Sequence, residues 1–165
     1  MVRAISFIGH HDSGKTRLLA RLVPVLVERG YRIGSIKHAP HLEDADVSGS
    51  DSSMHRAAGI ERVLLVAETS SGLFWTNDTA VPLDATVERH FADLDLVLIE
   101  GYKMGPFPKI EIYRRSPNLA REPLAGEIDV EAVISDDPIA LPDGVALFSP
   151  SRLLDIADFV ETLIA

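Results

Sequence analysis

The residues best suited to chemistry in this sequence form an anion-binding pattern at residues 9–16. Gly9-His10-His11-Asp12-Ser13-Gly14-Lys15-Thr16 matches the pattern G-x-x-x-x-G-K-[ST] at every fixed position. Glycines let the backbone turn so that successive amide N–H groups face one hollow, and the amino end of a following helix adds partial positive charge. Such a hollow suits the phosphates of a nucleotide. The sequence therefore predicts a nucleotide site here.

The residue types of this loop indicate individual roles. The ammonium group of Lys15 is expected to reach the β- and γ-phosphates, and the hydroxyl of Thr16 to take one position on Mg²⁺. Asp12 brings a carboxylate close to the phosphates, which lowers affinity unless it faces outward, and we expect it to face outward. The other loop residues expected to bind the nucleotide, mainly through their backbone N–H groups, are Gly9, His11, Asp12, Ser13, Gly14 and Arg17.

A second candidate group is the acid that ends an apolar run. The four large apolar residues of Leu96-Val97-Leu98-Ile99 predict a buried central strand, and Glu100 follows where the strand meets the ligand edge of the sheet. An acid there holds Mg²⁺ directly or through water, or orients an attacking water. Glu100 is therefore predicted to have a metal or catalytic role, with Lys15 as the other catalytic candidate. The alternative is a strand-end acid that only meets solvent.

Three further charged residues, Lys103, Lys109 and Asp136, each allow two interpretations. Lys103 and Lys109 bring positive charge to an acidic chain and suit either a second anion site or an ordinary solvated surface. Asp136 follows a predicted strand at 132–135, where its carboxylate could accept hydrogen bonds from guanine N1 and N2. The alternative for Asp136 is a turn-forming aspartate before Pro138. The sequence Asn-Lys-x-Asp, which often reads guanine, is missing.

The polar stretch from His38 to about Ser50 follows a predicted strand on the same edge. Its place next to the γ-phosphate suits a switch segment that orders around Mg²⁺ and nucleotide, and a solvated loop is the alternative. By residue type, His38, His41 and Asp44 could also ligate a divalent metal, although they lack helical spacing and cysteine partners.

The elements that would position these groups alternate between strands and helices. This alternation, with apolar strands and amphipathic helices, predicts an α/β fold of the P-loop NTPase type: a three-layer sandwich with a mostly parallel sheet. Strands are predicted at 4–8, 32–37, 62–67, 73–76, 95–100, 109–114, 132–135 and 145–148. Helices are predicted at 15–29, 52–58 with Asp51 as cap, 83–91 and 151–164, and residues 115–131 as a loop or lid.

Composition limits the possible functions. A chain of 165 residues with 46% hydrophobic content suits a single folded domain, 1–165. Its formal net charge of −9 argues against general binding to nucleic acid or to an anionic membrane. It has no cysteine and no apolar run of membrane-spanning length, and an early strand stands where a signal peptide would be, so we expect a cytoplasmic protein.

With these motifs identified, the chain resembles the MobB family, the molybdopterin-guanine dinucleotide biosynthesis protein B. The resemblance covers most of the first two thirds of the chain, in the family's order. The matching pieces are residues 9–16, Ser35-Ile36-Lys37-His38, Asp51-Ser52 with His55-Arg56-Ala57-Ala58-Gly59, Val97-Leu98-Ile99-Glu100-Gly101-Tyr102-Lys103, and Pro108-Lys109-Ile110-Glu111.

The resemblance implies a GTP-binding, weakly GTP-hydrolysing accessory protein that forms homodimers. It would assist a partner nucleotidyltransferase that joins guanine nucleotide to molybdenum cofactor. It also implies that Lys37, His38, Lys103 and Lys109 line the nucleotide site. The chain departs from the family at His10-His11-Asp12, where small or hydroxyl residues are usual, and in a shortened loop at 38–50. Two alternatives stay open: a small-molecule kinase that grips an anionic acceptor, and a GTP-regulated metallochaperone.

Overall fold

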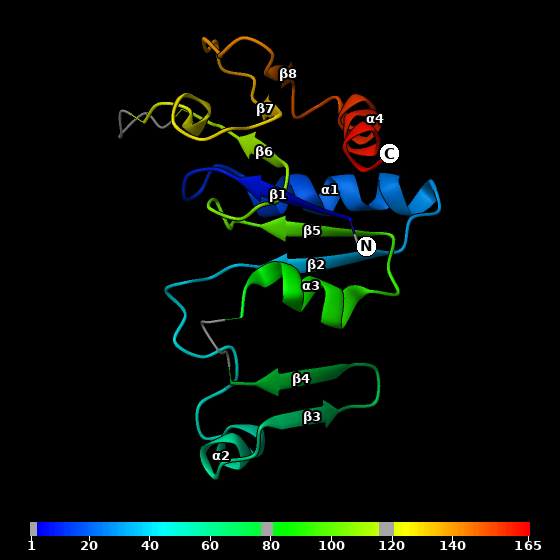
Figure 1. The fold of residues 1–165 in the computed structure, drawn as a ribbon, viewed down its shortest axis with the longest axis vertical. Coiled ribbons are helices and arrows are strands. Elements are labelled where there is room, and N and C mark those ends of the chain that lie inside the picture. Colours follow the sequence, from blue (N-terminus) through cyan, green and yellow to red (C-terminus); the bar gives the residue numbers. More distant parts are fainter. Residues whose placement is uncertain (1–2, 77–80, 116–120) are drawn as a thin grey trace. The chain divides into compact units, whose positions relative to one another are not determined.

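A computed structural model of the chain describes residues 3–76, 81–115 and 121–165. The fold consists of two compact units (Figure 1). The first contains residues up to His38 and from Leu83 onward, and the second contains Ala39–Pro82. The organisation as a single domain, expected from chain length, stays a prediction.

The first unit is built on a six-stranded sheet in the order β2-β5-β1-β6-β7-β8. Every neighbouring pair in this sheet is parallel, which confirms the predicted α/β class with a mostly parallel sheet. The strands are β1 (Arg3–Ile8), β2 (Ile33–Lys37), β5 (Leu96–Glu100), β6 (Lys109–Ile112), β7 (Ala132–Ile134) and β8 (Ala146–Phe148). Since all strands run the same way, their carboxyl ends form one edge.

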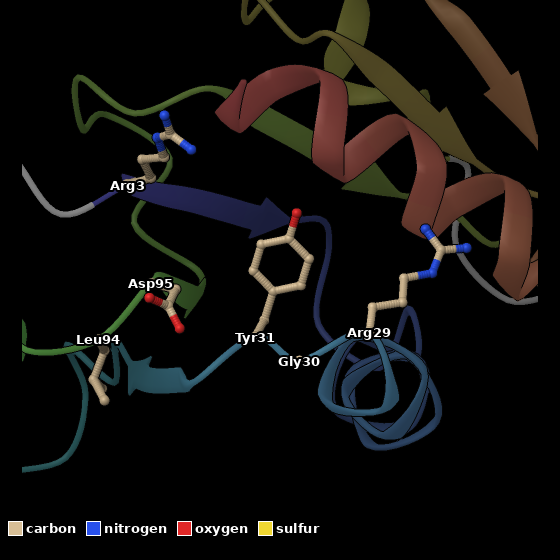
Figure 2. A pocket seen from close by; sticks show the side chains of 6 residues that line it. All are labelled: Arg3, Arg29, Gly30, Tyr31, Leu94 and Asp95. Carbon is tan, nitrogen blue, oxygen red and sulfur yellow. The ribbon is translucent and has the colours of Figure 1, made fainter.

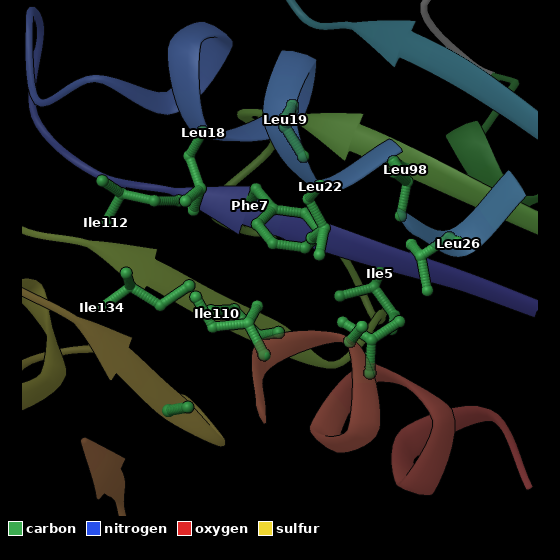
Figure 3. Packing of buried hydrophobic residues seen from close by; sticks show 14 of the residues in the cluster. Ile5, Phe7, Leu18, Leu19, Leu22, Leu26, Leu98, Ile110, Ile112 and Ile134 are labelled. Atoms are coloured by element: carbon green, nitrogen blue, oxygen red, sulfur yellow. The ribbon is translucent and has the colours of Figure 1, made fainter. Parts of the chain in front are cut away.

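Helices cover both faces of this sheet and form the three layers. On one face, α1 (Lys15–Glu28) and α4 (Leu153–Ile164) pack on the strands, and the cluster that joins them is fully apolar (Figure 3). Phe7, Leu22 and Leu98 lie in this cluster with at most 1% of their surface exposed. On the other face, α3 (Leu83–Phe91) packs through Val87 against Val97 and Ile99.

The segment after β6 covers the remaining part of that second face. Residues 121–130, which include the short 3-10 helix η1 (Leu124–Gly126), bury Leu124, Ala125 and Val130 against Ile8 and Val133. The part of the predicted lid that is described is therefore packed into the core. Residues 116–120 of that prediction lie outside the described residues.

Strand β6 is more deeply buried than its sequence pattern indicates. Its alternation of polar and apolar residues at 109–112 is typical of an edge, yet Ile110, Glu111 and Ile112 are all buried. The strand lies inside the sheet, between β1 and β7. The misleading residue is Glu111, which is fully buried although it is an acid.

The second unit contains α2 (Asp51–Ala57) and an antiparallel hairpin of β3 (Arg62–Val66) and β4 (Ser71–Trp75). The prediction that residues 62–67 form the third strand of the doubly wound sheet is therefore wrong in its placement. The cap of α2 was also misassigned, because the side chain of Ser50, and not that of Asp51, accepts a hydrogen bond from the Ser53 N–H.

A polar cluster ties the loop of residues 39–50 to α2. The guanidinium of Arg56 contacts Asp44 at 2.7 Å and Asp46 at 3.3 Å, and Asp46 also accepts hydrogen bonds from Ser50 and Ser52. The Arg56 guanidinium also lies 5.8 Å from the centre of the Phe74 ring. Within its own unit, this loop is therefore held by side-chain contacts.

Candidate functional site

The loop of residues 9–14 has the backbone geometry of a phosphate loop. Gly9, Asp12 and Gly14 all have positive φ, at 150°, 60° and 97°, and α1 starts directly after Gly14. At Gly9 a side chain has no room, because a Cβ there would lie 2.3 Å from the Ile112 carbonyl oxygen. The first glycine of the motif is thus required by the close approach of the β6 end, and Gly14 by its left-handed conformation.

Lys15 lies inside the hollow of this loop. Its ammonium group donates to the carbonyl oxygens of Gly9 at 3.2 Å and His10 at 2.7 Å, and to the Ser13 hydroxyl at 3.4 Å. Burial lowers the pKa of this ammonium group below its usual value, and the opposing pull of the Glu100 carboxylate is the next largest influence. The charge expected to meet phosphates is therefore present and partly shielded from water.

Thr16 and Glu100 meet beside this lysine. The Thr16 hydroxyl lies 2.8 Å and 2.9 Å from the two carboxylate oxygens of Glu100 and donates to them. The sheet register explains the meeting, since Glu100 ends β5 opposite Phe7 of β1, just before the loop. The Glu100 side chain is 14% exposed, and the Lys37 ammonium lies 3.8 Å from it. The structure therefore brings together four of the predicted residues, Lys15, Thr16, Lys37 and Glu100.

These groups fit a magnesium ion. Mg²⁺ prefers oxygen ligands and keeps several waters, and protein sites commonly supply one hydroxyl or carboxylate next to substrate phosphates. Thr16 and Glu100 supply one hydroxyl and one carboxylate beside Lys15, and both residues are at least partly exposed. When bound, the ion would neutralise phosphate charge.

The turn after Glu100 brings His38 and Tyr102 together. Gly101 and Tyr102 both have positive φ, 97° and 61°. The Tyr102 ring packs against Gly105 and meets the His38 ring edge-on, with 5.2 Å between centroids. Positive φ is uncommon for tyrosine, and these two ring contacts hold it there. His38 is thus at the sheet edge, as predicted, with its ring turned to an aromatic neighbour.

The other predicted cations differ in position. Lys103, in the same turn, lies near enough to Lys15 for its charge to lower the pKa of Lys15. Lys109 instead donates to the carbonyl oxygen of Phe107 at 3.1 Å. Arg17 is exposed on the first turn of α1. The charge of Lys103 therefore acts on the loop lysine.

The three residues that separate this loop from its family pattern have different environments. His11 and Asp12 pair at 3.4 Å with side chains 89% and 88% exposed, so Asp12 faces outward as expected. His10 instead turns toward residue 122, where its Nε2 lies 2.9 Å from the Glu122 carbonyl oxygen. Of the three, His10 is the residue whose side chain connects the loop to another segment of the first unit.

A cavity of about 620 Å³ lies at the carboxyl ends of β7 and β8. Asp136 and Asp137 line it, with Phe148 and Leu147 as apolar walls. One oxygen of Asp136 accepts from the Ser149 hydroxyl at 2.5 Å, and Asp137 accepts from the Arg115 N–H at 2.7 Å. Because β7 is two strands from β1, this cavity lies roughly 10 Å across the same sheet edge from the phosphate loop.

A second cavity, of about 500 Å³, lies at the other end of the strands, next to the amino ends of β1, β2 and β5 (Figure 2). Arg3 at the start of β1, Tyr31 before β2 and Asp95 before β5 line it. Arg29 also lines it, but its guanidinium is paired with Asp158 and Glu161. None of the predicted site residues takes part, because they lie at the carboxyl ends of the strands.

Two residues near the site had no role in the predictions. Glu111 is buried on β6, and Tyr102 has a positive φ in the turn beside Glu100. An acid within an apolar strand was a usable signal for the first. Among the described residues, no group of three or more histidine, aspartate or glutamate side chains that could hold a metal ion is found, so the structure adds no support for the metal site considered at His38, His41 and Asp44. Within those residues, no helix is long and apolar enough to cross a membrane.

Comparisons with known proteins agree with this geometry. The profile of the family described as "Molybdopterin guanine dinucleotide synthesis protein B" (MobB) matches residues 4–136. The molybdopterin-guanine dinucleotide biosynthesis adapter protein of Haemophilus influenzae is 35% identical over 160 residues, covering 95% of this chain and 86% of the relative. The protein of the same description from Escherichia coli is 34% identical over 167 residues, covering 97% and 92%.

Solved structures share the fold. A crystal structure of molybdopterin-guanine biosynthesis protein B superposes with a TM-score of 0.75 at 24% identity, covering 97% of this chain and 99% of the other. The Bacillus subtilis MobB structure gives a TM-score of 0.74 at 21% identity, covering 99% and 98%. Together with the profile match over residues 4–136, these similarities show that the chain belongs to the MobB family, molybdopterin guanine dinucleotide synthesis protein B.

Proposed function

We propose that this protein is a GTP·Mg²⁺-binding adapter in the formation of the molybdopterin guanine dinucleotide cofactor. Its relatives carry the description of adapter proteins in that biosynthesis. The observation that carries the nucleotide part is the meeting of Lys15, Thr16 and Glu100 at one end of the sheet. An ammonium, a hydroxyl and a carboxylate around a ring of backbone amides match the needs of a magnesium triphosphate.

Each residue has a defined task in this proposal. Lys15 leaves its carbonyl partners and binds the β- and γ-phosphate oxygens, while the loop N–H groups bind the remaining phosphate oxygens. Thr16 and Glu100 hold Mg²⁺, Glu100 directly or through water. Lys37, His38 and Lys103 surround the open side, where Lys37 already contacts the Glu100 carboxylate.

We propose that hydrolysis at this site is slow. Fast GTPases orient the attacking water with a glutamine and stabilise the transition state with an arginine. The chain contains no glutamine. Glu100 is the acid that lies beside Thr16, and its two oxygens already accept from the Thr16 hydroxyl. GTP binding then serves mainly to organise the adapter.

The cavity beside β7 and β8 is the proposed site of the guanine base. Guanine presents two neighbouring N–H donors, and a carboxylate accepts both. One oxygen of Asp136 is engaged by Ser149, which fixes the carboxylate while the other oxygen stays available. Leu147 and Phe148 supply apolar walls of the kind that a flat base requires.

We propose a homodimer that forms through the β3–β4 hairpin. Leu64 and Val66 of β3 and Leu73 of β4 lie on one face of the hairpin and are 61%, 69% and 42% exposed. A two-stranded hairpin is barely stable alone, and an exposed apolar face indicates an interaction surface. Since the face is apolar and the same in each copy, a second copy is its proposed occupant. The nucleotidyltransferase partner and the cytoplasmic location stay predictions.

The decisive experiment compares the affinities of GTP and ATP, each with Mg²⁺, for the purified protein. The proposal expects GTP to bind at least tenfold more tightly than ATP, with slow release of phosphate. Equal affinities would contradict the guanine assignment. Transfer of labelled phosphate to a small acceptor would indicate a kinase, and stoichiometric Ni²⁺, Zn²⁺ or Co²⁺ in the purified protein would indicate a metallochaperone.

A further inference from the structure

The buried acid of β6 has a role that neither the phosphate loop nor the cavity explains. Glu111 is 0% exposed and lies in the middle of the sheet. Among the described residues, no lysine, arginine or histidine forms an ion pair with it. A buried carboxylate without a cation is costly, so its partners must compensate. Those partners are two consecutive backbone amides.

The carboxylate of Glu111 fixes the start of η1. One oxygen accepts from the Leu124 N–H at 2.8 Å and the other from the Ala125 N–H at 2.9 Å. Two oxygens bound to two neighbouring amides set both the position and the orientation of this short segment. Without Glu111, both amides would be buried and unsatisfied.

The same segment is tied down a second time, three residues earlier. The Tyr113 hydroxyl donates to the Arg121 carbonyl oxygen at 2.9 Å, and Tyr113 itself is only 4% exposed. Residues 122 and 123 lie between these anchors, and the carbonyl oxygen of residue 122 has its own partner. This partner is the ring of His10, at 2.9 Å. Since a carbonyl only accepts, the imidazole Nε2–H donates.

These contacts form one connected path from the sheet to the phosphate loop. We propose that Glu111 is a positioning residue for that loop, acting through residues 121–125 and the hydrogen bond from His10 to the Glu122 carbonyl. Tyr113 supports the same path. The loop is then held from two sides, by the Ile112 carbonyl against Gly9 and by Glu122 against His10. The binding readout below rests on the proposed function, and the exchange readout does not.

The test combines Glu111→Gln with His10→Ala. Glutamine keeps the shape of the side chain but replaces one acceptor oxygen with a donor, so one amide loses its partner. A single hydrogen bond changes affinity by about three- to tenfold, and we expect each single variant to lower GTP affinity within that range. Since both act on one path, the double variant should lie within twofold of His10→Ala. If the fold-changes of the two single variants multiplied in the double variant, the proposal would be overturned.

Hydrogen exchange of the nucleotide-free protein supplies the second readout. We expect both variants to speed exchange of the amides of residues 9–16. Val160→Ala, a buried substitution on α4, is the control for a general loss of stability. In this variant the amides of residues 9–16 should exchange faster only to the extent that global unfolding becomes more frequent. Faster exchange at 124 and 125 in Glu111→Gln, with no change at 9–16, would show a purely structural role and overturn the proposal.

A milder variant keeps the test decisive if Glu111→Gln does not fold. Tyr113→Phe removes only the hydroxyl that holds Arg121. It should speed exchange at residues 9–16 in the wild-type background and have no further effect with His10→Ala. An effect of equal size in both backgrounds would overturn the proposal. If the wild-type protein bound no nucleotide, the proposed function would fail while the exchange data still decided this inference.

Discussion

The hydroxyl of Thr16 contacts both carboxylate oxygens of Glu100 although the two residues are 84 positions apart in the sequence. This contact joins the end of the phosphate loop to the end of the neighbouring strand β5. It brings the two proposed magnesium ligands together before any ion binds.

Glu100→Gln should keep the Thr16 contact and lose the negative charge. Glutamine still offers one acceptor oxygen, but a neutral amide is a weaker ligand for Mg²⁺ than a carboxylate. Without Mg²⁺, we expect the GTP affinity of the variant to stay within about threefold of the wild-type value. The gain in affinity on adding Mg²⁺ should fall by about tenfold or more, and the rate of phosphate release should fall as well. Titrations with and without Mg²⁺ measure both. An unchanged response to Mg²⁺ would make Glu100 a structural residue.

Lys15→Ala should remove nearly all nucleotide binding. Lys15 is the ammonium group inside the hollow, and its loss leaves the phosphates without their central positive charge. We expect affinity for GTP to fall by more than about a hundredfold, an effect of about 3 kcal/mol for a charged hydrogen bond. Arg21→Ala, an exposed residue of the same helix, is the matched control for loss of positive charge. A loss below tenfold for Lys15→Ala would refute the site.

Asp136→Asn should weaken the preference for guanine. An amide presents a donor where the carboxylate would accept from the base, so GTP would lose affinity while ATP would not. We expect the ratio of the two affinities to fall by about tenfold. Competition titrations of GTP and ATP provide the measurement. Asp143→Asn, an exposed acid outside the cavity, should preserve the ratio.

Leu64→Asp should convert the proposed dimer to a monomer. The side chain is 61% exposed on the apolar face of the hairpin, and a charge there would be buried between two copies. Leu154→Asp, at a 64% exposed position of α4, is the matched control and should remain dimeric. Light scattering during size-exclusion chromatography reads the mass directly. A wild-type protein that is monomeric at micromolar concentration would reject the hairpin interface.

The second unit should lose stability in acid. Hydrogen bonds from the Asp46 N–H and from Arg56 hold the pKa of Asp44 below its usual 3.8. Burial by itself raises the pKa of Asp46. Hydrogen bonds to this carboxylate, first of all that from the Ser52 hydroxyl, outweigh burial, so the pKa of Asp46 also lies below its usual value. A carboxyl group whose pKa is lower in the folded state than in the unfolded state stabilises the fold at pH values above its unfolded pKa. This stabilisation is lost as the pH falls through the folded pKa.

Below about pH 4, the unfolding transition of this unit should therefore move to lower temperature. The only tryptophan of the chain, Trp75, lies on β4, so its fluorescence follows the second unit. Asp44→Asn should flatten the dependence on pH and lower stability at pH 7. Glu43→Gln, an exposed neighbour, controls for loss of one charge. An equally steep acid transition in Asp44→Asn would contradict the assignment.

Most of the first unit was predictable because each of its elements has a local cause. The apolar run before Glu100 and the spacing of Leu18, Leu22 and Leu26 reflect burial on a sheet and on one helix face. The loop was predictable because its glycines and Lys15 serve one local purpose. The contact of Thr16 with Glu100 followed once both were assigned to the same edge of a parallel sheet.

The hairpin of the second unit was missed for a physical reason. Continuous apolar residues such as Val63-Leu64-Leu65-Val66 occur in buried parallel strands and equally in strands that another surface is meant to cover. A usable signal was present, because only residues 67–70 separate β3 from β4. Four residues suffice for a hairpin, whereas a parallel connection needs a dozen or more.

The partners of Glu111 and the path through Glu122 were beyond prediction for a different reason, although the acid in an apolar strand was itself a visible signal. Whether an acid in a strand faces water or two amides depends on a segment twelve or more residues away, and no local pattern encodes that distance. The role of His10 has the same origin, since its partner is 112 positions further along the chain. Contacts of this kind follow from tertiary packing alone.

The ammonium of Lys15 is surrounded by two carbonyls and a hydroxyl of its own loop. An incoming anion must therefore outcompete these internal oxygens, and affinity depends on the difference between two coordination shells. A singly charged anion gains little from that exchange, whereas a triphosphate gains at several oxygens at once. The internal partners of Lys15 would therefore favour polyphosphates over singly charged anions at this loop.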